Sequence, residues 1–218
     1  MKNLFITRIP VAVLFAVCIL GHPMTSLAQG LDFDPVIMAA LSFGGDKLAE
    51  IQTWEGTHLT DGQGERLRNS GTATIRAGRF VCLGAGLRIS KPKTPWGLQV
   101  TLGYFVDRAE AISDVSNSDA FKFDRWPLES QLFFTQQKFR FGAGLTYHMF
   151  PKLKFSNGGD SFQKILEFNN ALGYLLEAGY DTGYGWVSLK YAIISYDCTQ
   201  GGSAKGNNIA FAWNLYLH

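Results

Sequence analysis

Cysteine is scarce in this chain, and its scarcity excludes one class of fold. The sequence has 218 residues and 3 cysteines, of which Cys18 lies in an apolar N-terminal run. Only Cys82 and Cys198 remain beyond that run, too few for a small domain held together by disulfides. They fall in stretches that we expect to form non-adjacent strands. Both are therefore predicted to be free thiols.

Net charge is also absent once the N-terminal segment is set aside. The full sequence has 20 Lys and Arg residues against 18 Asp and Glu residues, and the segment contributes Lys2 and Arg8 but no acid. The remainder balances at 18 − 18 = 0. A neutral chain has no general attraction to nucleic acid. We expect no nucleic-acid partner.

The sequence lacks cofactor motifs as well. His58, His148 and His218 are scattered, and their spacing does not suggest a metal site. The phrases "GAGLRI" and "GAGLTY" lack the third glycine and the strand-to-helix context of a dinucleotide site. We therefore expect no cofactor and no metal.

Long apolar runs are missing after the N-terminus. Lys2 and Arg8 are followed by the run Ile9–Leu20, and then by Ser26 and Ala28 at small-residue cleavage positions. This pattern predicts a secretory signal peptide over 1–28 and a mature domain over 29–218. The run is shorter than the roughly 20 residues of a spanning helix. If the chain crosses a membrane, it must do so as strands.

The mature chain does contain alternation with a period of two residues. In "FRFGAGLTYHM", Phe139, Phe141 and Leu145 share one parity, while Arg140 and His148 share the other. Such alternation predicts strands with one apolar and one polar face. It recurs in eight stretches, near 31–44, 72–90, 97–109, 119–134, 138–149, 165–180, 185–197 and 207–217.

The connections between these stretches alternate in length. Short ones follow the second, fourth and sixth stretches, and long polar ones follow the first, third, fifth and seventh. Short turns at one end and long loops at the other are typical of a barrel inserted from the periplasm. The sequence therefore predicts an all-β fold, an eight-stranded antiparallel up-and-down transmembrane β-barrel.

The residue types at the positions between the large apolar residues indicate which face of the strands meets lipid. A soluble lipocalin-like barrel turns its apolar parity inward and presents charged residues to water. Here the second parity is dominated by Gly, Ala, Ser and Thr, which suit a narrow lumen, so the apolar parity is predicted to face lipid. We expect lipid-facing Leu83, Leu87, Leu102, Phe141, Leu145, Leu189, Ile193 and Phe211. We expect a polar lumen network of Arg88, Arg140, Lys190, Glu129 and Glu177, and interfacial aromatics Trp96 and Trp186.

These features resemble the small eight-stranded outer-membrane barrels of Gram-negative bacteria, of the outer-membrane protein A or X type. The resemblance covers most of 30–218, in phrases such as "FGAGLTYH" and "NIAFAWNLYL". It implies the cell outer membrane, export by the general secretory route, insertion by the assembly machinery, and a monomer among outer-membrane lipid and lipopolysaccharide. Members commonly end in an aromatic residue, whereas this chain ends in His218.

Three polar residues are candidates for catalysis. His148 points inward by parity, Glu167 on the next strand is also inward by parity, and Ser161, like Ser156, lies on the connection between them. A hydroxyl, an imidazole and a carboxylate are the parts of a nucleophilic triad. Several barrel enzymes of this membrane trim lipid A acyl chains with such groups, so a lipid A-modifying hydrolase is one hypothesis, although the sequence lacks their local His-Ser signature. Filling of the lumen by polar side chains is the simpler interpretation.

The function that we expect is a structural or surface-interaction role without an open pore. Eight strands leave a lumen that side chains nearly fill. The long connection 45–70 is the expected contact surface. Its Arg66 and Arg68 are candidates for contact with lipopolysaccharide phosphates, although a solvated loop is the simpler interpretation. The hydrolase and the soluble ligand-binding barrel remain the two alternatives.

Overall fold

The alternating stretches form strands throughout the residues that the computed structural model describes, 30–56, 67–110, 120–156 and 162–217. No helix within them is long and apolar enough to cross a membrane. The strands, which belong to the unit Asp32–His218, are β1 (Asp32–Gly44), β2 (Lys47–Gly56), β3 (Leu67–Arg76), β4 (Phe80–Ser90), β5 (Trp96–Glu110), β6 (Ala120–Gln136), β7 (Phe139–Ser156), β8 (Phe162–Glu167), β9 (Ala171–Asp181), β10 (Gly185–Ile193), β11 (Ser195–Asp197), β12 (Ser203–Lys205) and β13 (Asn208–Tyr216).

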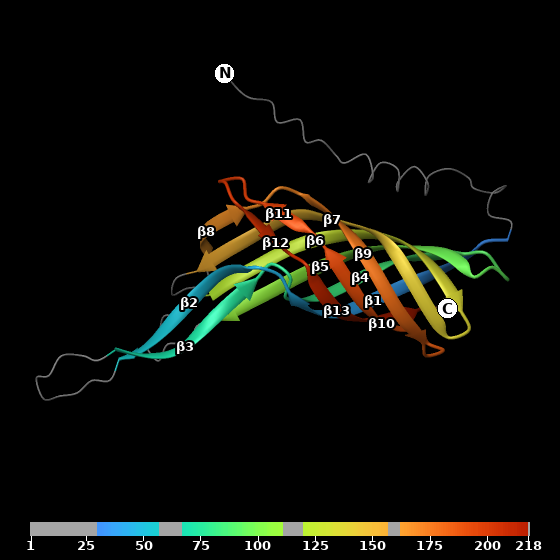
Figure 1. Cartoon of the computed structure of the whole chain (residues 1–218), viewed down its shortest axis with the longest axis horizontal. Helices are drawn as coiled ribbons and strands as arrows, with labels where there is room; N and C mark the ends of the chain where they lie inside the picture. The colour runs from blue at the N-terminus through green and yellow to red at the C-terminus, as the bar shows by residue number, and fades with distance from the viewer. Residues whose placement is uncertain (1–29, 57–66, 111–119, 157–161, 218) are drawn as a thin grey trace, which may run out of the picture. The chain divides into compact units, whose positions relative to one another are not determined.

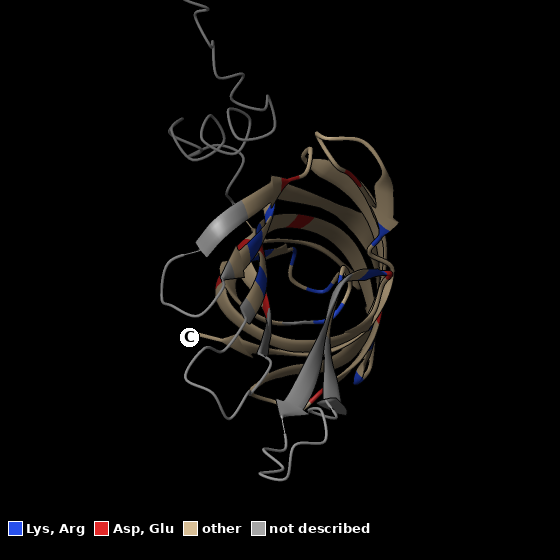
Figure 2. Cartoon of the chain, turned by 90° about the vertical axis from the view of Figure 1, so that its left-hand side faces the viewer, with Lys and Arg blue, Asp and Glu red and all other residues tan. Residues whose placement is uncertain are grey.

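Eight of these strands close into a barrel. Their order around the wall is β6, β5, β4, β1, β13, β10, β9 and β7, and a further ladder between β6 and β7 joins the two ends (Figure 1). All neighbours are antiparallel. The chain is an eight-stranded antiparallel β-barrel, as the sequence predicts. Figure 2 looks into the ring from the end that carries β2 and β3.

The two ends of the barrel differ as expected, with one correction. Short turns at 91–95, 137–138 and 182–184 join β4 to β5, β6 to β7 and β9 to β10. The predicted connection 45–70, in contrast, contains β2 and the start of β3, and these two strands pair with each other from Lys47↔Arg76 to Gly56↔Leu67. Likewise β7 and β8 extend into the connection predicted after 149 and pair there. The ladders continue beyond the predicted strand ends because each extension finds a partner strand.

Breaks in the strands separate a lower barrel, the ring of eight strands, from an upper extension that includes β2, β3, β8, β11 and β12. In β7 the break lies at Phe150, which has φ 52° and precedes Pro151. The Phe150 N–H donates to Asn170 Oδ1 at 2.9 Å. An extra residue moves the following side chains to the opposite face. Inward positions in β7 therefore change from even, as at His148, to odd, as at Leu153.

The interior is polar in the lower barrel and apolar in the upper extension. Met38, Ala40, Cys82, Phe105 and Ala212 form a small apolar layer inside the lower barrel. The upper extension encloses a larger apolar cluster of Ile75, Ala77, Phe123, Leu153, Ala171, Ile194, Tyr196 and Ala204. Apolar side chains thus lie inside the barrel at both levels, next to the charged groups of the lower barrel.

Inward glycines are required where the lumen is narrow. A Cβ at Gly144 would lie 2.2 Å from the carbonyl oxygen of Ser130 and 2.7 Å from the Cα of Gln131. Both are backbone atoms of β6, which cannot move without breaking the β6–β7 ladder. Ala143, one residue away, is exposed on the outer face.

We predict that Gly144→Val destabilises the barrel, whereas Ala143→Val does not. Overpacking costs about 1–3 kcal/mol, and the outward methyl groups of the control variant meet no such obstacle. Urea unfolding of the two proteins in detergent measures the difference. Equal midpoints for the two variants would contradict the inward placement of Gly144.

Candidate functional site

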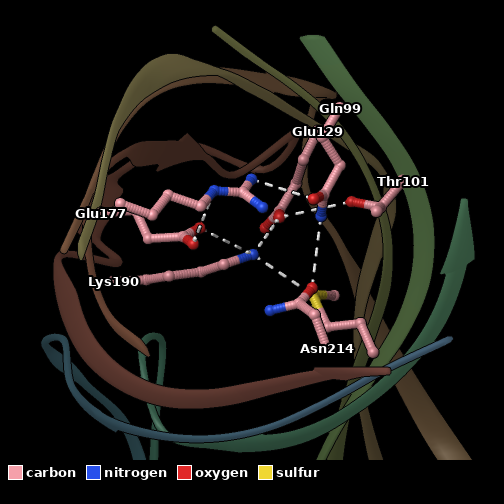
Figure 3. A network of polar contacts seen from close by, with 8 residues as sticks. Gln99, Thr101, Glu129, Glu177, Lys190 and Asn214 are labelled. Atoms are coloured by element: carbon pink, nitrogen blue, oxygen red, sulfur yellow. Dashed lines mark hydrogen bonds and ion pairs between the residues drawn. The ribbon is translucent and has the colours of Figure 1, made fainter. Parts of the chain in front are cut away.

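Lys190 of β10 is the centre of the lumen network (Figure 3). Its Nζ lies 2.8 Å from Glu129 Oε2 and 3.9 Å from Glu177 Oε2, and it also donates to Met38 Sδ at 3.2 Å. The side chain of Lys190 is 5% exposed and those of its two acidic partners 8% and 0%. Charges this deeply buried are retained only when they are paired.

Arg140 of β7 provides the second cation. Its Nη2 donates to Gln99 Oε1 at 2.9 Å, its Nε lies 3.6 Å from Glu177 Oε1, and its guanidinium stacks 4.1 Å from the Phe133 ring centroid. Gln99 in turn donates to Asn214 Oδ1 at 3.2 Å. Two cations balance two carboxylates, and the contacts cross the lumen from β5, β6, β7, β9, β10 and β13.

Arg88, the remaining predicted member, lies apart from this network. Its Nη1 is 3.9 Å from Asp34 Oδ2, and its guanidinium lies 5.2 Å from the Phe133 ring and 4.9 Å from the Tyr216 ring. All five predicted lumen residues therefore point inward. Arg88 pairs separately, near the end with short turns.

Trp186 corrects one expectation. The side chain predicted at the outer interface is 1% exposed and lies inside, with the Arg140 guanidinium 5.5 Å from its ring. It shares the even parity of Ser188 and Lys190, both of which are buried. Parity alone assigns Trp186 to the lumen. The expectation was wrong because it placed Trp186 at the interface for being a tryptophan and did not use its position in the alternation. Trp96 is exposed as expected.

The proposed triad does not assemble. His148 is buried, with its Nδ1 2.6 Å from the hydroxyl of Tyr196, and Phe105 packs edge-on at 5.5 Å. Glu167 instead lies on the surface, where it pairs with Lys152 Nζ at 2.8 Å. Ser161 lies outside the described residues, and the side chain of Ser156 is not described.

Glu167 lies on the surface because the inward and outward positions exchange between β8 and β9. Odd residues face inward in β9, but Ile165 and Glu167 are exposed in β8, because residues 168–170 separate the two strands. Tyr196, which sequence reasoning missed, keeps the inward even parity of β10 across the break at Ile194, and that parity was the signal that could have found it. Cys82 and Cys198 are free thiols. Among the described residues, no group of three or more His, Cys, Asp or Glu is arranged to hold a metal.

Large apolar side chains cover the outer wall of the lower barrel and form what we call the apolar belt. Leu87 is half-buried. The other seven predicted lipid-facing residues are exposed: Leu83, Leu102, Phe141, Leu145, Leu189, Ile193 and Phe211. The same face carries Phe33, Ile37, Leu41, Leu132, Leu172, Leu176, Ile209 and Trp213.

Aromatic pairs bound this belt on β5 and β6. Trp96 packs on Phe134 at 4.9 Å, the lower girdle, and Tyr104 packs on Trp126 at 5.0 Å, the upper girdle. On each strand the two girdle positions are eight residues apart, from 96 to 104 on β5 and from 126 to 134 on β6. Eight residues rise about 27 Å along a strand, or roughly 20 Å at a tilt of 35–45°. That height is close to the apolar band of about 25 Å in membrane barrels.

Charged groups lie beside the upper girdle. Asp124 Oδ2 is 2.9 Å from Lys154 Nζ and 3.5 Å from Lys122 Nζ, and the Lys122 amine lies 5.7 Å from the Tyr104 ring. Aromatic rings next to such charges are typical of a membrane–water interface.

Comparisons with known proteins give only distant similarities. No family model matches the sequence, and no curated protein matches it. Among solved structures, the chain is similar to Ail, the attachment invasion locus protein of Yersinia pestis, in complex with the heparin analogue sucrose octasulfate. The identity is 13% and the TM-score 0.49, over 86% of this chain and 97% of that one.

Two other structures show similar coverage. OprG from Pseudomonas aeruginosa has 11% identity and a TM-score of 0.37, over 86% of this chain and 97% of its own. AlkL, solved in lipid bilayers, has 14% identity and a TM-score of 0.35, over 84% and 90%. Ail, OprG and AlkL are all outer-membrane proteins. Similarity at this level assigns no function to the chain.

We predict that Lys190→Met costs about 3–5 kcal/mol of unfolding free energy, because it leaves two buried carboxylates without their shared cation. Lys152→Met is the matched control: its exposed pair with Glu167 contributes less than about 1 kcal/mol. Urea unfolding in lipid vesicles, followed by tryptophan fluorescence, gives both values. An equal loss of unfolding free energy in the two variants would contradict a stabilising role of the lumen network.

Proposed function

We propose that this chain is an integral outer-membrane β-barrel with a closed lumen and a structural or surface-interaction role. The observation that carries the proposal is the apolar belt between the two aromatic girdles. Soluble monomers rarely expose contiguous apolar patches beyond a few hundred Å². A wall that is apolar around its circumference and bounded by aromatic rings instead matches the hydrocarbon layer of a bilayer.

The distribution of side chains argues against the soluble alternative. A lipocalin-like barrel needs an apolar lumen to hold a ligand, but Lys190, Arg140, Glu129 and Glu177 occupy the lumen of the lower barrel. The hydrolase alternative has no support from geometry either. His148 contacts Tyr196, and Glu167 pairs with Lys152 at the surface.

The two ends of the barrel suggest its orientation. Short turns are expected on the periplasmic side, and the upper extension then faces outward from the cell. The connection 45–70, which includes β2 and the start of β3, is the proposed contact surface. Export from the signal peptide 1–28, insertion of 29–218 by the assembly machinery, a monomeric state and contact with outer-membrane lipid and lipopolysaccharide complete the proposal.

Membrane insertion is tested by a charge on the belt. Leu189 is 57% exposed beside inward Lys190, and we expect Leu189→Arg to cost about 2–4 kcal/mol in lipid vesicles. Ser195→Arg, at an exposed position of β11, is expected to cost little because it meets water. Urea unfolding in vesicles measures both. If Leu189→Arg leaves the unfolding free energy unchanged, the proposal that the barrel spans a membrane is contradicted.

Closure of the lumen gives a separate prediction. The contacts among Lys190, Glu129, Glu177 and Arg140 cross the lower barrel, and the apolar cluster fills the upper extension. We expect no steady single-channel current from the reconstituted protein in planar bilayers. A persistent open-channel current would show that the lumen conducts, and would leave the apolar belt unaffected.

A further inference from the structure

A groove interrupts the outer wall just above the upper girdle. It has a volume of about 370 Å³, and its apolar lining is Leu41, Phe43, Val81 and Val106. Val106 lies two residues beyond Tyr104 on β5. The groove therefore overlaps the upper end of the apolar belt, to which Leu41 belongs, near the level where lipid headgroups would replace hydrocarbon.

The groove lies at the foot of a seam in the sheet. The β4–β5 ladder ends at Val81↔Val106. Above that pair, β3 is hydrogen-bonded to β2 and β5 to β6. No ladder joins β3 to β5 within the described part of the chain. At this level β3 and β5 are therefore joined through a side chain, since the backbone N–H of Arg76 donates to Asp107 Oδ2, and not through a backbone ladder.

Positive charge gathers around the lip of the groove. Arg79 lines it, is exposed, and forms no hydrogen bond or ion pair with another described residue. Arg76 lies three residues earlier, across the Ala77–Gly78 turn, and its Nη1 donates to the Gly45 carbonyl oxygen at 3.2 Å. Lys47 is the register partner of Arg76. Three cations therefore lie at the base of one hairpin.

The one acidic residue of the groove is already engaged. Asp107 is 7% exposed, its Oδ2 accepts from the backbone N–H of Arg76 at 3.4 Å, and its charge acts on the buried Arg125 guanidinium. Nearby, Asp46 Oδ2 accepts from the backbone N–H of Lys205 at 2.8 Å. Of the two charged residues that line the groove, Asp107 is buried and Arg79 is exposed, so the charge that the groove presents to a ligand is the Arg79 guanidinium.

We propose that this groove seats one lipid A molecule of the outer leaflet. One acyl chain lies against Leu41, Phe43, Val81 and Val106, and a lipid A phosphate binds the guanidinium of Arg79, with Arg76 adding positive potential. Arginine forms paired, charge-assisted hydrogen bonds with phosphate oxygens. The inference rests on the proposed function, because lipid A phosphates lie at this level only if the upper extension faces outward.

The test is native mass spectrometry of the detergent-solubilised full-length protein titrated with bis-phosphorylated lipid A. We expect one tightly bound lipid per barrel. Arg79→Gln is expected to weaken binding about tenfold, the loss of a charge-assisted contact. Val81→Trp, which fills the groove without changing charge, is expected to weaken it as well. Lys152→Gln, an exposed cation on β7, is the matched control and should bind as the parent protein does.

A second arm keeps the protein constant and changes the lipid. Lipid A without phosphates should bind the parent protein about tenfold more weakly, since it lacks the group that Arg79 holds. Equal affinity for the two forms, an unaffected Arg79→Gln, or equally tight binding of phosphatidylglycerol would overturn the site.

The experiment distinguishes failure of the proposed membrane function from failure of the lipid A site. If the membrane function is wrong, the processed chain stays soluble without detergent, which is observed before any lipid is added. Heat-modifiable migration of every variant on a gel confirms that the compared proteins are folded.

Discussion

Backbone hydrogen bonding is the constraint on which this structure depends. In hydrocarbon an unpaired N–H or C=O costs several kcal/mol, so a sheet in a bilayer must have no edge. The ladder from Val36↔Tyr216 to Gly44↔Asn208 joins the first and last strands, and β6 pairs with β7 to complete the ring. With the backbone satisfied in the wall, outward side chains are free to be wholly apolar, and the belt follows.

Closure with eight strands fixes the interior as well. A narrow lumen admits glycine at positions such as Gly144, where a Cβ would meet the backbone of β6. The room that remains holds a balanced set of charges around Lys190, each stabilised by a partner from another strand. Strand breaks, as at Phe150 and Ile194, lie in the upper part, where water can satisfy an interrupted ladder. The seam beside β5 and its groove belong to the same region.

Much of this architecture follows from parity, because a strand has only two faces. Parity places Leu189 and Lys190 correctly on opposite sides of the wall, and it also places Trp186 inside once residue type is set aside. It fails where an interruption shifts the phase. Glu167 moves to the surface because residues 168–170 separate β8 from β9, whereas Tyr196 keeps the inward parity of β10 and contacts His148. Such breaks are held by tertiary contacts, which a local pattern does not contain.

The central claim is that the apolar face of the wall meets hydrocarbon and the other face does not. It is tested most directly with two single-tryptophan proteins in vesicles whose lipids carry bromine on the acyl chains. Trp213 is half-exposed on the outer wall of β13, and Trp186 is enclosed. The account predicts strong quenching of Trp213 fluorescence and little quenching of Trp186. Equal quenching of the two, or the reverse order, would contradict it.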